Sequence, residues 1–115
     1  MSKPFQHAKN SARMYGGKWE DYKDLHNLMD ETKSGHAAMR HRCIFHSSYG
    51  IYLVEKIFGM TLTTSDKIQV ATRDIAEQHV LEDLGKIPSL DEWLNEMNEK
   101  PWMMGIKKYP IKLVD

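Results

Sequence analysis

Residues 39–59, MRHRCIFHSSYGIYLVEKIFG, carry apolar side chains at intervals of three and four residues. Because helical positions i, i+3, i+4 and i+7 share one face, this spacing predicts a helix from about His36 to Phe58, ended by Gly59. His46 falls in the middle of its apolar face. Burying an imidazole without a hydrogen-bond partner lowers the stability of the fold by about 1–3 kcal/mol. His46 therefore needs a hydrogen-bond acceptor, or it binds a metal ion. The predicted face consists of Met39, Cys43, His46, Gly50, Leu53, Val54 and Ile57.

Four other segments combine helical spacing with residues that favour helix starts or ends. They are residues 2–15, 18–33, 73–84 and 89–100. Thr72 is predicted to cap the third of these helices, and Gly85 is predicted to end it. Ser89 and Glu92 have the S-x-x-E spacing of a capping box at the start of the last one.

Residues 60–70, MTLTTSDKIQV, are rich in β-branched side chains around a turn signal and predict a short β-hairpin. Together these elements predict a mostly α fold, a single compact helical domain of about five helices with one short β-hairpin. We expect this domain to span residues 1–100. Residues 101–115 contain Trp and Met side chains and are predicted to pack as a C-terminal tail on the domain or on a second subunit, which would give a homo-oligomer.

The composition is that of an ordinary globular chain. Of 115 residues, 41% are hydrophobic and 28% are charged, and the formal net charge is zero. We therefore expect one domain without an extended nucleic-acid surface. No apolar run approaches the roughly 20 residues of a membrane span, and residues 1–17 lack the apolar core of a secretion signal. These features favour a cytoplasmic protein, and Cys43 is alone, which excludes an internal disulfide.

Histidines fall on the apolar faces of three predicted helices. His26 shares its face with Trp19, Tyr22, Met29, Asp30 and Lys33, and His79 shares its face with Thr72, Ile75, Ala76 and Asp83. Neutral imidazole and carboxylate groups suit Zn, Mn, Fe or Ni. We predict that a divalent metal ion is bound by His26, Asp30, His46 and His79, and Asp83 is a further candidate. For each histidine taken alone, a hydrogen bond within the core is the alternative.

A basic cluster, Arg40-His41-Arg42, follows closely after Lys33. Arginine pairs bidentately with phosphate, and the N-terminal end of a helix favours an anion. The pattern predicts that Lys33, Arg40, His41 and Arg42 bind a phosphate-bearing ligand. The alternative is that both arginines form structural ion pairs with nearby acids. Those acids are Asp24, Asp30, Glu31 and Glu77.

Acidic residues surround His79 in the segment AEQHVLEDLGKIP. If the site is catalytic, Asp83 or Glu77 is predicted to act as general base, while a metal ion activates water for attack on a phosphoester and an arginine holds the phosphate. Glu82 is interpreted as a solvated helix acid.

Three motifs support a resemblance to a known family. They are H-x-x-x-D-x-x-K at 26–33, R-H-R-x-x-x-H at 40–46 and E-Q-H-V-x-E-D at 77–83. Over residues 5–104 the chain resembles a family of short uncharacterised proteins of bacteriophages and bacteria. The resemblance implies a phage or bacterial origin, and the host cytoplasm if the chain is phage-encoded, but no activity. A fold-level analogy with helical metal phosphohydrolases of the HD type is weaker, because the chain lacks their adjacent His-Asp dipeptide.

These observations leave an enzyme and a non-catalytic protein both open. The leading interpretation is a buried His/Asp/Arg site that binds a divalent metal, a phosphate-bearing small molecule or both, with metal-dependent phosphoester hydrolysis as the candidate reaction. One alternative is a phage protein that sequesters a nucleotide-like ligand without chemistry. Another is a module that binds and inhibits a host protein through the tail at 101–115.

Overall fold

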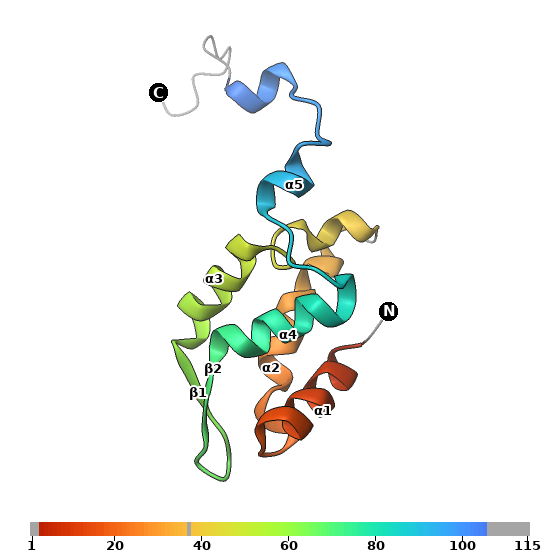
Figure 1. Cartoon of the computed structure of the whole chain (residues 1–115). Helices are drawn as coiled ribbons and strands as arrows, with labels where there is room; N and C mark the ends of the chain where they lie inside the picture. Colours follow the sequence, from red (N-terminus) through yellow and green to blue (C-terminus); the bar gives the residue numbers. More distant parts are fainter. Residues whose placement is uncertain (1–2, 37, 106–115) are drawn as a thin grey trace, which may run out of the picture.

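Helices α1, α2, α3 and α4 surround one core in the computed structural model, which describes residues 3–36 and 38–105 (Figure 1). Within these residues the α-helices are α1 (Pro4–Tyr15), α2 (Lys23–Asp30), α3 (Ser48–Phe58), α4 (Thr72–Leu84) and α5 (Leu90–Leu94). Four short 3₁₀ helices are η1 (Trp19–Asp21), η2 (Glu31–Ser34), η3 (Met39–Cys43) and η4 (Pro101–Met104). The predicted fold class, a mostly α single domain of five helices with one hairpin, is confirmed.

The predicted face of α4 is confirmed. Ile75, Ala76 and His79 are completely buried, and the side chain of Asp83 is also inaccessible. Val80 is also completely buried, and α4 packs against α1, α2 and α3, so α4 lies at the centre of the helical body. Apolar residues of every neighbouring segment complete the core, namely Ala8, Tyr22, Leu25, Met29, Ile51, Val54 and Val70.

The predicted long helix at 36–58 is wrong. The structure has the 3₁₀ helix η3, then a turn at 44–47, and α3 begins only at Ser48. Ser47 is the N-cap of α3, and its Oγ accepts a hydrogen bond from the Gly50 N–H at 3.0 Å. A serine oxygen that satisfies one of the free N–H groups of the first turn favours a helix start at this position. His46 is therefore buried, as predicted, but it lies in a turn and not on a helix face.

Gly50 explains how this turn fits against α3. A Cβ atom at position 50 would collide with the backbone of Ile44 and Phe45, so glycine allows the turn to lie directly on the helix. The rest of the predicted face is divided: Val54 is buried, whereas Met39 and Ile57 are exposed.

Other predicted boundaries shift more modestly. The segment at 18–33 is divided into η1, α2 and η2, because regular α-helical structure covers only Lys23–Asp30. Ala71, not Thr72, occupies the N-cap position of α4, and the buried Thr72 hydroxyl has no hydrogen-bond partner among the described residues. Gly85 ends α4 in the left-handed conformation with φ 77°, as predicted. The capping box of Ser89 and Glu92 is also confirmed.

The predicted helix at 89–100 is much shorter in the structure. After the capping box, α5 covers only Leu90–Leu94, and η4 follows at Pro101–Met104. These two helices project away from the helical body in Figure 1. We refer to residues 90–105 as the C-terminal arm. Residues 106–115 of the predicted tail lie outside the described residues.

The predicted hairpin is confirmed. Strands β1 (Thr61–Thr63) and β2 (Gln69–Ala71) pair antiparallel, with Leu62 opposite Val70.

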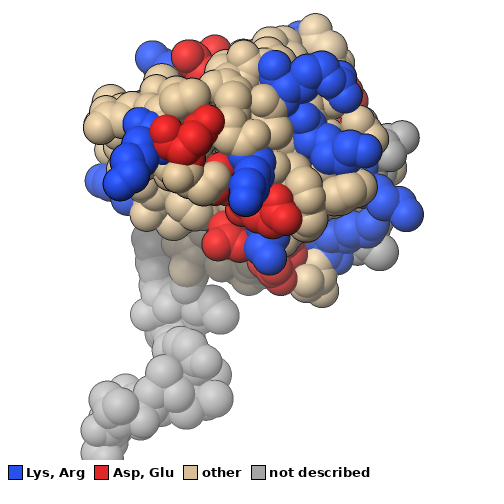
Figure 2. Space-filling view, turned by 90° about the horizontal axis from the view of Figure 1, so that it is seen from below, with Lys and Arg blue, Asp and Glu red and all other residues tan. Residues whose placement is uncertain are grey.

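Lys and Arg side chains lie among Asp and Glu side chains on the face shown in Figure 2. Within the part of the chain that the structure describes, every helix is too short or too polar to cross a membrane.

Candidate metal centre

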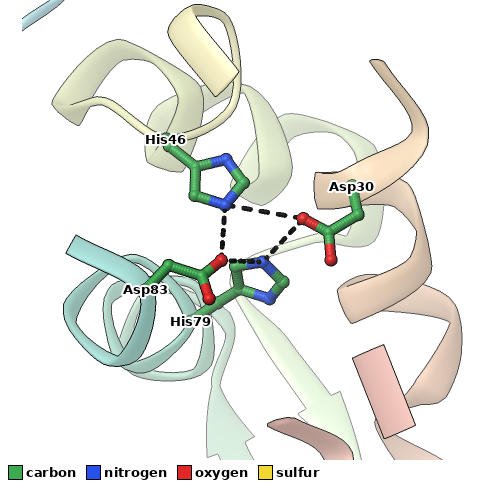
Figure 3. A group of neighbouring side chains, drawn as sticks. All are labelled: Asp30, His46, His79 and Asp83. Atoms are coloured by element: carbon green, nitrogen blue, oxygen red, sulfur yellow. Dashed lines mark hydrogen bonds and ion pairs between the residues drawn. The ribbon is translucent and has the colours of Figure 1, made fainter. Parts of the chain in front are cut away.

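Asp30, His46, His79 and Asp83 point toward a common centre from three separate segments (Figure 3). Asp30 is the last residue of α2, and His46 lies in the turn before α3. His79 and Asp83 lie one turn apart on α4, so their i, i+4 spacing places both side chains on the same face. One donor atom from each residue lies within 4.8 Å of the other three.

The distances between these donor atoms fit a single ion. His46 Nε2 lies 2.9 Å from Asp83 Oδ2 and 3.5 Å from Asp30 Oδ1. His79 Nε2 lies 3.4 Å from the same Asp83 oxygen and 3.2 Å from the same Asp30 oxygen. A tetrahedral ion with bonds of about 2.0 Å has ligand atoms about 3.3 Å apart, which falls within this range of distances. The four residues could therefore hold a metal ion.

The turn that carries His46 is held by hydrogen bonds to Pro88 and to Trp93 of the C-terminal arm. The indole Nε1 of Trp93 donates a hydrogen bond to the His46 carbonyl oxygen at 3.0 Å. The Ser48 N–H donates to the Pro88 carbonyl oxygen at 2.8 Å. These two bonds, together with the contact at Gly50, fix the position of the His46 backbone.

The carboxylate of Asp83 is held in its ionised form. Burial alone would raise its pKa, but hydrogen bonds from His46, His7 and His79 lower the pKa well below its usual range. The buried Arg42 adds a positive charge, with Nη2 3.8 Å from Asp83 Oδ2. An ionised, completely buried carboxylate surrounded by imidazoles is a suitable ligand for a cation.

The two histidines of the cluster differ in their preference for a proton. Burial lowers the pKa of His46, and its hydrogen bond to Asp83 only partly opposes that effect. Burial acts in the same direction on His79, but hydrogen bonds to Asp30 and Asp83 outweigh it and raise the pKa of His79. Nε2 of His79 faces both carboxylates, so a proton and a metal ion would compete for the same position.

His26 lies behind His79 and not among the four converging residues. Its Nδ1 is 2.8 Å from His79 Nδ1 and its Nε2 is 2.8 Å from Ser11 Oγ. Burial lowers the pKa of His26 to about 2, and the neighbouring His79 and His7 act in the same direction. The structure therefore places His26, predicted as a ligand, as a neutral hydrogen-bond partner of His79.

The predicted anion-binding residues separate in space. His41 is buried and its Nδ1 lies 3.2 Å from Thr32 Oγ1, while burial and the nearby Arg42 lower its pKa. His41 and Lys33 line a cavity of about 630 Å³ that also reaches Asp30. The other lining residues are Lys3, Pro4, Asn27, Glu31 and Ser34.

Arg40 and Arg42 differ in their surroundings. Arg40 is exposed and lines a different hollow with Trp93 and Leu84. Arg42 is buried beside Asp83, and its Nε and Nη2 have no hydrogen-bond partner among the described residues. The acid nearest to Arg42 is therefore Asp83, which was not among the predicted structural ion-pair partners.

The two predicted general bases also lie in different places. Asp83 is one of the four converging residues. Glu77 lies on an outer part of α4, where it pairs with the exposed Arg73 at 3.6 Å and lines a separate hollow beside Tyr15. The structure therefore brings Asp83, but not Glu77, to the cluster.

Sequence analysis missed His7 and its pairing with Glu82. His7 is completely buried, with Nδ1 2.6 Å from Glu82 Oε1 and Nε2 3.1 Å from Asp83 Oδ1. Glu82 is exposed, as interpreted, and it is in addition a partner of His7. The available signal was the small residues Ala8 and Ala12, which mark a buried face of α1 that His7 shares.

The comparisons with known proteins give a family but no activity. No curated protein and no solved structure has significant similarity to the chain. A model of an uncharacterised family matches residues 2–103, whereas the phage or bacterial origin that the resemblance implies stays a prediction. The chain therefore belongs to the family described as a domain of unknown function, DUF6915.

Proposed function

We propose that this protein binds one divalent transition metal ion through Asp30, His46, His79 and Asp83. The observation that carries the proposal is the convergence of four donor atoms from three segments, with neighbouring donors 2.9–3.5 Å apart. Two imidazoles and two carboxylates form a mixed nitrogen and oxygen site, which suits Zn, Mn, Fe or Ni. The donor oxygens of Asp30 and Asp83 lie within 4.8 Å of each other, and two carboxylates this close repel each other unless a cation lies between them, so an ion stabilises the arrangement.

The proposed activity is hydrolysis of a phosphoester on a small molecule. Activation of water for attack on phosphorus is the chemistry that such an ion supplies. In that reaction a bond forms between phosphorus and the water oxygen, the ester oxygen–phosphorus bond breaks, and the proton of water ends on the released alcohol. The cavity of about 630 Å³ supports this substrate class, because it reaches Asp30 and carries Lys3, Lys33 and His41.

The chain's own residues suggest how a phosphate would be held and a proton accepted. Lys33 and Lys3 offer positive charge at the cavity wall. His41 lines the same wall, and its lowered pKa leaves it neutral near pH 7 and able to accept a proton. Asp83 is assigned here as a ligand, because its Oδ1 faces His7 and its Oδ2 faces the cluster.

A second candidate is a non-catalytic protein that retains a nucleotide-like ligand. The number of donors favours it, because four protein ligands fill a tetrahedral ion completely, whereas catalytic zinc sites keep a position open for water. Binding and inhibition of a host protein, the phage or bacterial origin and the cytoplasmic location all remain predictions from the sequence.

The metal site is tested by thermal melting of metal-free protein with added Zn²⁺, Mn²⁺, Ni²⁺ or Fe²⁺, and again after chelation. A metal that binds only the folded state should raise the melting temperature of the wild type. His46→Gln and His79→Gln should lose this shift, whereas Glu77→Gln, on the same helix as His79 but outside the cluster, should keep it. Absence of a shift with every metal in wild-type protein shown to be metal-free would contradict the proposal.

The reaction is tested separately with the metal that gives the largest shift. Release of inorganic phosphate from p-nitrophenyl phosphate and from nucleoside monophosphates should depend on that metal. Tight binding of a nucleoside monophosphate that is recovered unchanged would favour the sequestering protein instead.

A further inference from the structure

A continuous chain of hydrogen bonds runs from Gln78 on α4 through Ser11 and His26 to Nδ1 of His79. Its first member is Gln78, which is buried beside α1. Gln78 Nε2 lies 3.1 Å from the His7 carbonyl oxygen and 3.0 Å from Glu82 Oε2. Both partners are acceptors only, so they require the NH₂ group of Gln78 on that side and fix the orientation of the amide. The carbonyl oxygen of Gln78 therefore faces Ser11.

The orientation of Gln78 determines the direction of the next hydrogen bond. Ser11 Oγ lies 2.6 Å from Gln78 Oε1, and two oxygens this close require a hydrogen between them. Ser11 is the only one of the two that has a proton to give, so its hydroxyl donates to Gln78. The same Oγ lies 2.8 Å from His26 Nε2 and, with its one proton already used, must accept there.

The proton on His26 Nε2 in turn determines the tautomer of His79. A neutral His26 with its proton on Nε2 has only a lone pair on Nδ1. His79 Nδ1 lies 2.8 Å away and must then donate to it. With a proton on Nδ1, the other nitrogen of a neutral His79 has its lone pair available, and this Nε2 faces Asp30 and Asp83.

We propose that Ser11 and Gln78 are positioning residues that act through His26 to hold His79 in the tautomer whose Nε2 can ligate a divalent cation. The consequence for metal affinity rests on the proposed metal site, but the tautomer can be measured without a metal. Outer hydrogen-bond partners of a ligating histidine typically change metal affinity by about 10–100-fold when they are mutated. Neither Ser11 nor Gln78 touches the ion position itself, so they act by orienting His26 and His79.

The direct test uses protein with ¹⁵N-labelled histidine, in the metal-free and the Zn²⁺-loaded state. Long-range ¹H–¹⁵N spectra distinguish a proton on Nδ1 from one on Nε2. In the wild type we expect His26 to carry its proton on Nε2 in both states, and we expect the Nδ1-protonated form of His26 to increase in Ser11→Ala. A wild-type His26 protonated on Nδ1 would overturn the proposal whether or not the protein binds metal.

The second measurement is Zn²⁺ affinity by competition with a chromophoric chelator. Ser11→Ala and Gln78→Met should each weaken binding by about 10–100-fold. Thr72→Val is the matched control, because Thr72 is equally buried on α4 but its hydroxyl has no partner among the described residues. Unchanged affinity in folded Ser11→Ala and Gln78→Met would overturn the positioning role. Wild-type protein that binds no Zn²⁺ but has the expected His26 tautomer would contradict the proposed function while leaving the hydrogen-bond order intact.

Discussion

The helical body and the C-terminal arm both depart from the usual distribution of polar and apolar residues. The body buries polar side chains, and the arm exposes apolar ones. Four histidines of the body, His7, His26, His46 and His79, are completely buried. In the arm, by contrast, Trp102 is 68% exposed and Met104 is 82% exposed. The buried imidazoles are tolerated because most of their nitrogens have a partner, whereas the apolar side chains of the arm have few neighbours to pack against.

This difference indicates that different interactions stabilise the body and the arm. The body depends on a polar network that loses stability whenever one partner is removed. The arm contributes little burial and meets the body mainly at Trp93, whose indole donates to the His46 carbonyl oxygen. Exposed apolar side chains of this kind are common at partner interfaces, and the packing of the tail at 101–115 stays a prediction from the sequence.

The largest effect is expected from removal of a carboxylate in the body. Asp83→Ala should destabilise the metal-free protein by about 3–5 kcal/mol, because it leaves His7, His46 and the Arg42 charge buried without their acceptor. Urea denaturation at pH 7 measures this change. Glu77→Ala is the control on the same helix and should cost well under 1 kcal/mol, because its ion pair with Arg73 is largely exposed. Equal losses of unfolding free energy in both variants would contradict a stabilising role of the buried network.

A smaller effect is expected where the His46 turn contacts α3. Gly50→Ala should cost about 1–3 kcal/mol and weaken Zn²⁺ binding, because the new methyl group pushes against the backbone of Ile44 and Phe45 and displaces His46. The matched control is Gly35→Ala, where the nearest atom to a new Cβ is 3.6 Å away and φ is −90°. If Gly50→Ala binds Zn²⁺ as tightly as the wild type, the position of His46 does not depend on this contact.

Acid should weaken the body through His26. Its folded pKa is depressed to about 2, so between about pH 6.5 and 2 the unfolded state binds a proton that the folded state does not. Stability contributed by a neutral His26 is therefore lost as the pH falls, by up to about 2 kcal/mol between pH 7 and 5. Urea denaturation of the metal-free protein at both pH values measures this loss. The loss should shrink in His26→Gln but persist in His36→Gln, which replaces an exposed histidine.

The smallest effect on stability is expected from the arm. Removal of residues 101–115 should change the unfolding free energy of the body by no more than about 0.5 kcal/mol, because residues 101–105, the described part of this segment, are exposed. Zn²⁺ affinity should also be unchanged. If the wild type self-associates, light scattering should show that the truncated protein does not. A large loss of stability on truncation would remove the contrast between the body and the arm.

The sequence by itself determined the features that depend on local spacing. The buried face of α4, with Ile75 and His79 on it, follows from helical periodicity alone. Gly85 and the capping box at Ser89 mark helix boundaries because they satisfy free backbone groups within a few residues. The pairs His26–Asp30 and His79–Asp83 were predictable for the same reason.

Only the tertiary structure decided which of these residues meet. His26 and His79 are inward on their own helices, yet the packing of α1, α2 and α4 makes one a candidate ligand and the other its hydrogen-bond partner. His46 reaches the cluster from a turn, because Ser47 starts a new helix and Gly50 lets the turn approach it. Periodicity specifies the direction of a side chain from its own axis. The point where side chains of separate helices converge depends on how those helices pack, which local spacing does not encode.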